Sequence, residues 1–306
     1  TTRIGWERVP PSTMRVTYEA TGQDLTGGTG KDVLQTFPPH AWRDAATAPT
    51  WRAETWLCPR GRLKSATGTK FVFEYAMPGI VPDFGAADAD PTTEPTPWSR
   101  DVQNGLITKY LAKATYGADT YWGGKDLVLL AKHAVFASRT NHPDATALLS
   151  KARAALIDWL TWTPGETAHY FAYYPRWKGL LGFQSSYGSD QFTDNHFHYG
   201  YLIHAAALVG TLDPRFLSDY GPMLRKIVQQ YANWDRNSAE FPFLRTFEPW
   251  TGHSYAGGTS SPSGNNQEST SEAMQSWIGQ FLLGSAMGDT AMRDRYFEML
   301  KAGGSA

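Results

Sequence analysis

Two glutamates, Glu268 and Glu272, stand four residues apart in a polar stretch that begins at Asn265. The apolar residues that follow, from Trp277 to Leu282, recur with the spacing of a helix, which predicts that both carboxylates lie on one helix face, one turn apart. Carboxylates at that spacing repel each other, so stability alone gives no reason for the pair. Acidic residues also occur at solvated helix starts, where the helix dipole favours them. The pair is therefore either a helix start or part of an acid–base site.

A second cluster, the segment 194–201, combines one aspartate with two histidines and two tyrosines. Asp194 stands at an expected helix start, where its ordinary role would be to cap the helix. So many titratable and aromatic groups within about two helical turns are typical of a pocket rim.

Two chemistries fit this cluster. In the first, Asp194 faces one of the glutamates across a cleft, and one carboxyl donates a proton to a glycosidic oxygen while the other activates water or attacks the anomeric carbon. In the second, Asp194, His196 and His198 hold a metal that activates water. Ligands two residues apart on a helix point in different directions, and no third His or Cys has suitable spacing. We therefore favour the carboxylates and expect neither a metal nor another cofactor.

Two weaker clusters offer further polar and aromatic side chains. The segment 119–125 precedes an expected helix, and it is either a loop leading into that helix or an element that binds sugar hydroxyls through Asp119 and Lys125. The segment 241–258 is too rich in glycine and aromatic residues to be a simple connector.

The elements that must position these clusters change in kind near residue 97. Residues 1–96 are β-rich, with strand-like runs at 14–18, 51–57 and 70–75 and a proline-rich linker at 85–97. From residue 97 to 306, apolar stripes predict seven helices, and a hairpin is expected at 168–193. The stripes span residues 102–114, 127–135, 148–160, 194–210, 213–231, 268–282 and 292–300. Short joins between them predict antiparallel neighbours, as in a helical toroid.

Composition narrows the class of partner. Aromatic residues make up 14% of the 306 residues, and not all of these rings can lie in a core. Trp and Tyr suit surfaces that are apolar on one side and wet on the other, such as those that bind sugar rings. A net charge of −1 without a Lys/Arg cluster does not suggest nucleic acid. No apolar run is long enough to span a membrane, and Cys58 is the single cysteine.

Four motifs follow one another along most of the chain. They are Asp-x-Tyr-x-Gly-Gly-Lys at 119–125, Asp-x-His-Phe-His-Tyr-Gly at 194–200, Gly-His-Ser-Tyr-Ala-x-Gly at 252–258 and Asn-Gln-Glu-Ser-x-Ser-Glu-Ala at 266–273. With these motifs the chain resembles glycoside hydrolase family 81, the endo-β-1,3-glucanases that cut laminarin-type glucans. Asn195 stands where that family usually has a histidine.

The resemblance implies a β-sandwich followed by an (α/α)6 barrel, and hydrolysis that inverts the anomeric configuration. We expect a mainly α fold, with an incomplete toroid in residues 97–306 that is truncated at its C-terminal end, preceded by a partial sandwich and linker in residues 1–96. By resemblance, Asp194 is the general acid, Glu268 is the general base that activates water, and Glu272 assists in the same site. The residues expected to bind substrate are Asp119, Tyr121, Lys125, His196, His198, Trp250 and His253.

The expected partner is a β-1,3-glucan, either laminarin or a fungal or algal cell-wall glucan, bound by a monomer without nucleic acid or membrane. A polymeric substrate outside the cell implies secretion, although no signal peptide is present in this chain. One alternative is a non-catalytic β-glucan-binding protein, which the three retained carboxylates disfavour. The other is a toroid glycosidase that acts on another polysaccharide.

Overall fold

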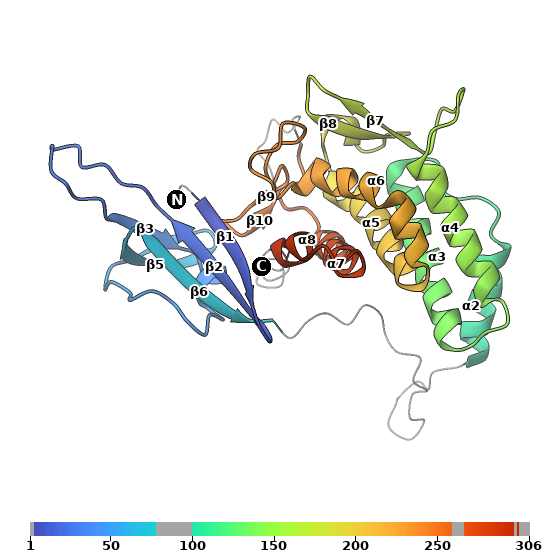
Figure 1. Ribbon diagram of the computed structural model, residues 1–306, viewed down its shortest axis with the longest axis horizontal. Helices are drawn as coiled ribbons and strands as arrows, with labels where there is room; N and C mark the ends of the chain where they lie inside the picture. The colour runs from blue at the N-terminus through green and yellow to red at the C-terminus, as the bar shows by residue number, and fades with distance from the viewer. Residues whose placement is uncertain (1–2, 78–99, 259–265, 297–298, 300–306) are drawn as a thin grey trace.

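The computed structural model describes residues 3–77, 100–258, 266–296 and 299. Its N-terminal part holds two three-stranded antiparallel sheets, and its C-terminal part is mainly helical (Figure 1). The first sheet has the order β1–β2–β6, with β1 at Arg3–Val9, β2 at Thr13–Glu19 and β6 at Lys70–Ala76. The second has the order β3–β5–β4, with β3 at Val33–Phe37, β5 at Gly61–Gly68 and β4 at Thr55–Cys58. The short helix α1 (Pro39–Trp42) follows β3.

The strict alternation of buried and less buried side chains explains the strands β2 and β6. Every second side chain of both strands is buried, because successive residues of a strand point to opposite faces. Both strands were predicted from the sequence and are confirmed. The strand expected at 51–57 is shorter than predicted, since β4 begins at Thr55. Trp51 packs its ring against Phe37 and Phe73 instead of extending the ladder.

Each predicted helical stripe overlaps a helix, although the end of the last stripe, at 297–298 and 300, lies outside the described residues. The hairpin expected between the third and fourth stripes is confirmed. The helices are α2 (Arg100–Ala112), α3 (Thr120–Arg139), α4 (Ala145–Leu160), α5 (Asn195–Leu212), α6 (Pro214–Ala232), α7 (Thr270–Ala286) and α8 (Thr290–Arg295). The hairpin consists of β7 (Tyr170–Tyr174) and β8 (Gly179–Phe183), and η1 (Ser189–Gln191) leads from it to α5. A small ribbon pairs β9 (Phe247–Glu248) with β10 (His253–Ser254). The predicted linker at 85–97 and the domain boundary at residue 96 lie outside the described residues.

Helix α5 is the centre of the helical part. Every residue from Asn195 to Gly210 is buried, as expected of a helix that is apolar on all sides. Two glycines let its neighbours approach closely. A Cβ on Gly124 of α3 would lie 3.0 Å from a backbone oxygen of α5, and a Cβ on Gly200 of α5 would lie 2.5 Å from the Cβ of Ser276 on α7. The sequence thus packs α3, α5 and α7 tightly enough for side chains at their N-terminal ends to meet.

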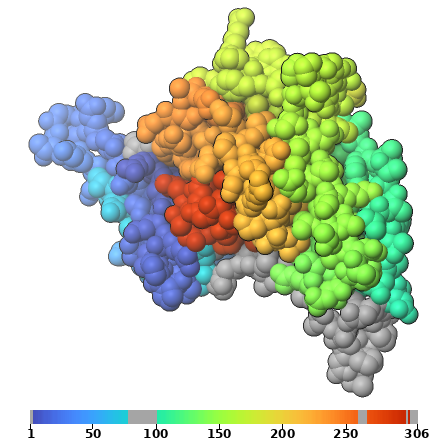
Figure 2. All heavy atoms as spheres, turned by 45° about the vertical axis from the view of Figure 1, so that its right-hand side comes forward, coloured from blue at the N-terminus to red at the C-terminus, as the bar shows by residue number. Residues whose placement is uncertain are grey.

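The N-terminal strands contact the helical part beside its last described helix. α8 packs against β1, and in Figure 2 the red atoms of the α7–α8 region lie beside the blue atoms of the N-terminal strands. Within the described ranges, no helix combines the length and the apolar character needed to cross a membrane.

Candidate active site

Backbone hydrogen bonds join three segments that are distant in the sequence. The Asp194 N–H donates to the Ala256 carbonyl at 2.9 Å, and the Ala256 N–H donates to the Asn266 carbonyl at 2.8 Å. Gly258 reinforces this arrangement, because a Cβ at that position would lie 2.5 Å from the backbone of the turn that precedes α5. The start of α5, the loop after β10 and the segment that leads into α7 are therefore fixed to one another. These are three of the four motifs singled out from the sequence.

Asp194 precedes α5 but does not cap it with its side chain. Its backbone is left-handed, with φ 54, and its carboxyl accepts no hydrogen bond from the first turn of the helix. The side chain is 8% exposed, and its Oδ1 has no hydrogen-bond partner among the described residues. Burial, followed by the charges of Glu268 and Glu272, raises the pKa of Asp194 from its ordinary 3.8 to about 7. Asp194 is thus a carboxyl that keeps its proton through mildly acidic pH and is about half protonated at pH 7.

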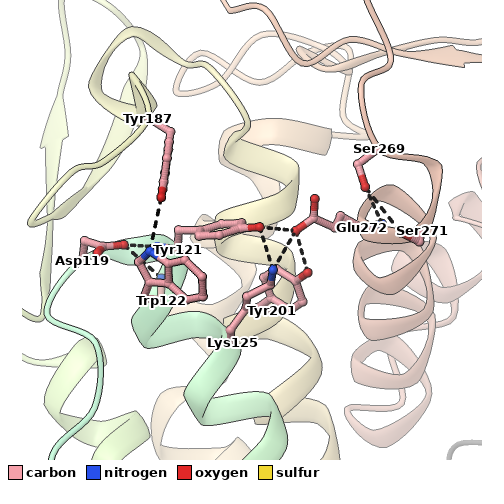
Figure 3. Close-up of polar contacts among 9 residues, drawn as sticks. All are labelled: Asp119, Tyr121, Trp122, Lys125, Tyr187, Tyr201, Ser269, Ser271 and Glu272. Atoms are coloured by element: carbon pink, nitrogen blue, oxygen red, sulfur yellow. Dashed lines mark hydrogen bonds and ion pairs between the residues drawn. The ribbon is translucent and has the colours of Figure 1, made fainter.

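Glu272, in the first turn of α7, has the opposite environment. Its Oε1 accepts hydrogen bonds from Tyr201 at 2.7 Å and from Tyr121 at 2.8 Å, and the Lys125 ammonium lies 3.5 Å away (Figure 3). Burial raises the pKa of Glu272, but hydrogen bonds from the two tyrosines and Ser269 and the Lys125 charge outweigh it, and the pKa lies below its ordinary value. Glu272 is therefore ionised beside a protonated aspartate.

Glu268 does not share a helix face with Glu272, so that prediction is wrong. α7 begins at Thr270, and Ser269 is its N-cap, whose hydroxyl accepts from the Glu272 N–H at 3.4 Å. Glu268 therefore precedes the helix, in a left-handed conformation with φ 60. Its side chain is exposed and has no hydrogen-bond partner among the described residues, while its charge reaches Asp194. Like Asp194, it holds a backbone conformation that is uncommon outside glycine and that occurs often at functional sites.

The 119–125 motif contributes to the same site from α3. Asp119 is the N-cap of that helix: its Oδ1 accepts from the N–H groups of Tyr121 and Trp122 at 2.8 and 2.9 Å, and from the Ser186 hydroxyl at 2.9 Å. Asp119 therefore caps the helix that this segment was expected to lead into. Tyr121 and Lys125, one turn apart, reach Glu272 together, and the Lys125 ammonium donates to the Tyr121 hydroxyl at 2.6 Å.

The two histidines of the 194–200 motif point to different sides of α5. His198 faces α3, where its Nδ1 lies 2.7 Å from the Thr120 hydroxyl. His196 faces α7, where its ring stacks on Trp277 at 5.6 Å, and it is fully buried. With no exposed surface, His196 cannot contact a sugar in this structure, which corrects the expectation that it binds substrate. Burial lowers the pKa of His196 to about 3 and that of His198 to about 4, so both rings are neutral.

The metal hypothesis required both of these histidines and Asp194 around one ion. The opposite orientations of the two rings argue against that arrangement. Across the part of the chain that the structure describes, no group of three or more His, Cys, Asp and Glu side chains is arranged to hold a metal.

Trp250 and His253 lie on the side of the β9–β10 ribbon that meets the N-terminal strands. The Trp250 indole N–H donates to the Thr36 carbonyl of β3 at 2.7 Å, which ties the ribbon to the second sheet. Burial and then the Arg60 charge lower the pKa of His253. Neither side chain contacts Asp194 or Glu272 through any interaction that the structure shows, so the structure does not group them with the carboxylates.

Three aromatic residues of the site were not among the predicted site residues. Tyr201 lies seven residues after Asp194 and three after His198. Residues at these spacings share one face of a helix, so the sequence could have placed Tyr201 near them. Trp122 and Tyr187 join through a hydrogen bond of 3.3 Å, and their side chains are 51% and 59% exposed. They place an open aromatic surface beside Tyr121, whose ring centroid lies 5.2 Å from each of theirs.

Comparison with known proteins points to one family. The Glycosyl hydrolase family 81 C-terminal domain matches residues 100–302. The glucan endo-1,3-beta-D-glucosidase of Acetivibrio thermocellus is 37% identical over 96% of this chain and 38% of its own length. The enzyme of the same name from Thermobifida fusca is 37% identical over 92% of this chain and 36% of its own length. A solved structure of a mutant glycoside hydrolase family 81 protein from Clostridium thermocellum covers 99% of this chain and 42% of that chain, with 34% identity and a TM-score of 0.88.

These matches confirm the resemblance inferred from the four motifs. They also show that the chain spans less than half the length of the relatives it matches.

Proposed function

The chain belongs to glycoside hydrolase family 81, and from this membership we propose that it catalyses endo-acting hydrolysis of β-1,3-glucan. The observation that carries the proposal is the contrast between the carboxyls of one site. Asp194 keeps its proton to about pH 7, whereas the pKa of Glu272 lies below its ordinary value. Adjacent carboxyls whose environments separate their pKa values are the arrangement that acid–base catalysis requires.

Asp194 is the proposed general acid. A buried carboxyl without a hydrogen-bond partner among the described residues is free to donate its proton to a glycosidic oxygen as the bond breaks. The fixed backbone around it, tied to Ala256, holds the donor in place while the side chain itself stays unpaired.

Glu268 is the proposed general base. Its exposed carboxylate has no hydrogen-bond partner among the described residues, so both oxygens are available to a water molecule. A base that activates water opposite the acid inverts the anomeric configuration. Glu272 is less suited to this role because its carboxylate already accepts two tyrosine hydroxyls and lies near an ammonium group. We assign Glu272 the role of a permanent anion that helps to keep Asp194 protonated.

The aromatic surface of Trp122 and Tyr187 supports a sugar as the ligand. Rings that are half exposed beside buried carboxyls can stack against the apolar face of a glucose unit. Lys125 on α3 is proposed to contact the sugar near the bond that is cut, whereas the buried ring of His198 is proposed to act through its contact with Thr120.

The remaining parts of the proposal follow from family membership. We propose that the helices form part of an (α/α)6 toroid and the two sheets part of a β-sandwich, and that the protein acts as a secreted monomer on laminarin or cell-wall glucan.

The test compares the wild type with Asp194→Asn and Glu268→Gln on laminarin, and measures released reducing ends. Glu240→Gln is the matched control, because Glu240 is an exposed glutamate whose ion pair is with Lys226 and with none of the site residues. We expect at least 10³-fold lower turnover for both site variants with glucan binding retained, and no change for the control. Proton NMR of the first product from a linear β-1,3-glucan should detect the α-anomer. A wild type that binds laminarin without releasing reducing ends would instead identify a glucan-binding protein, and a β-anomer would exclude inversion.

A further inference from the structure

A second cavity lies away from the carboxylates, where the first strand meets the helical part. It has a volume of about 500 Å³ and lies between β1, the loop that follows α6 and the end of α8. Arg3, Trp6, Arg236 and Arg295 are among the side chains that line it. None of these residues belongs to the four motifs of the sequence, and the proposed glucan hydrolysis uses none of them.

The three arginines share this cavity with little negative charge to balance them. Arg3 pairs with Glu19 at 4.0 Å, with side chains that are 70% and 43% exposed. Within the described part of the chain, neither Arg236 nor Arg295 forms an ion pair. Instead, Arg236 lies 3.8 Å over the ring of Phe243, and Arg295 lies 5.3 Å from the ring centroid of Trp6.

The two described acidic residues closest in the sequence form their hydrogen bonds with other groups. Asp294 adjoins Arg295 in the sequence but pairs with Arg293 at 2.6 Å. Asp235 lines the cavity, and its Oδ1 accepts the Asn237 N–H at 2.9 Å. Burial lowers the pKa of Arg295, and repulsion from the other two arginines lowers it further. The charge of Asp294 offsets only part of these effects, and the pKa of Arg295 stays below its ordinary value.

Trp6 adds an unused donor. Its indole N–H is buried, and it has no acceptor among the described residues. Guanidinium groups present planar pairs of N–H donors that match the oxygens of phosphate, sulfate and carboxylate groups. A neutral glucan would leave three positive charges uncompensated, so this cavity does not fit a second glucan subsite.

From this arrangement we propose that the cavity is a binding site for an oxyanion of the phosphate or sulfate type, held by Arg3, Arg236 and Arg295. The anion is either free in solution or an ester group on a sugar chain. The site is independent of the proposed hydrolysis, since no residue contributes to both.

The test is isothermal titration calorimetry of the full chain with sodium phosphate, at constant ionic strength set with sodium chloride. Arg236→Gln and Arg295→Gln are compared with Arg176→Gln, a control at an exposed arginine of the β7–β8 turn that removes the same charge. We expect saturable phosphate binding to the wild type, at least tenfold weaker binding to each cavity variant, and unchanged binding to the control. Circular dichroism spectra and laminarin hydrolysis show whether the variants are folded.

A parallel titration compares dextran sulfate with neutral dextran. Binding of dextran sulfate that depends on Arg236 and Arg295, without binding of inorganic phosphate, would support the site with an ester group as its ligand. Equal affinity of all four proteins for both anions, or no saturable binding to the wild type, would overturn the proposal. Absence of laminarin hydrolysis by the wild type would bear on the proposed function alone, because phosphate binding is measured without glucan and circular dichroism still reports the folding of the variants.

Discussion

Replacement of Asp194 by asparagine tests the electrostatics of the site without reference to turnover. Asparagine has nearly the same shape as a protonated aspartate but cannot ionise. Burial and two neighbouring carboxylates raise the pKa of Asp194 from 3.8 to about 7 in the folded protein. The unfolded chain has no such environment, so it binds the proton of Asp194 less tightly than the folded chain does.

The direction of the effect follows from this difference. Below about pH 4 the aspartate is protonated in both states, and its contribution to stability is fully present. As the pH rises toward 7, the unfolded chain loses the proton first, and the contribution falls until the folded carboxyl has also ionised. At about 1.36 kcal/mol for each pKa unit, the loss between pH 4 and pH 9 is at most about 4 kcal/mol. Relaxation around a charged carboxylate reduces this loss to a value on the order of 2 kcal/mol.

We therefore expect Asp194→Asn to be about 2–4 kcal/mol more stable than the wild type at pH 9 and nearly equal to it at pH 4. Urea unfolding at several pH values between 4 and 9, followed by circular dichroism, measures this difference. Asp190→Asn is the control, since Asp190 is exposed in η1, four residues before Asp194. A difference between variant and wild type that does not change with pH, or one that shrinks as the pH rises, would refute the account of Asp194 as a buried, protonated acid.

Three further predictions concern individual hydrogen bonds and packing contacts. Tyr201→Phe removes one hydrogen bond from Glu272 and should raise the pKa of that glutamate, which an NMR titration of its side-chain carboxyl measures; an unchanged pKa would contradict the role of Tyr201 in stabilising the ionised carboxylate. Gly200→Ala should destabilise the protein by about 1–3 kcal/mol because its methyl would meet α7 at 2.5 Å, whereas Gly105→Ala, with open space around it, should stabilise by about 0.5–1 kcal/mol. The midpoints of urea unfolding measure both changes in stability. Shifts of the two midpoints in the same direction would contradict the packing argument. Trp250→Phe loses a hydrogen bond to β3 and should cost about 1 kcal/mol with little change in laminarin turnover, which a large fall in kcat would contradict.

The periodic spacing of apolar residues predicted most of the helices and strands. The helices at 145–160 and 214–232 have clear apolar stripes, and β2 and β6 have clear alternation. α5 was found despite being buried on all sides, because Asp194 marked its start and Gly210 lay near its end. The strand β4 was misjudged because Trp51 has high strand propensity but packs as a ring against two phenylalanines, a tertiary contact that no local pattern reveals.

The site was predicted in part. Asp194 was expected to approach the two glutamates, and their charges do act on it. The misplacement of Glu268 was avoidable, because Ser269-Thr270-Ser271-Glu272 has the Ser-x-x-Glu pattern of a capping box, which places the helix start after Glu268. The contact of Tyr201 with Glu272 was not predictable in the same way. It depends on how closely α5 and α7 pack, which the spacing within either helix does not specify.

The two aspartates that precede helices show why the acid itself could not be identified by position alone. Asp119 has an extended backbone, with φ −97, and its carboxylate accepts two N–H groups of α3. Asp194 occupies the same position before α5, but with φ 54 its side chain turns away from the helix and accepts none. Accepted backbone N–H bonds stabilise the charged form of a carboxyl, and burial without them stabilises the neutral form. The backbone bonds of Asp194 to Ala256, and of Ala256 to Asn266, fix the segments around the left-handed residue. The loop after β10 therefore contributes to the chemistry indirectly, because it fixes the backbone that keeps the carboxyl of Asp194 from capping α5.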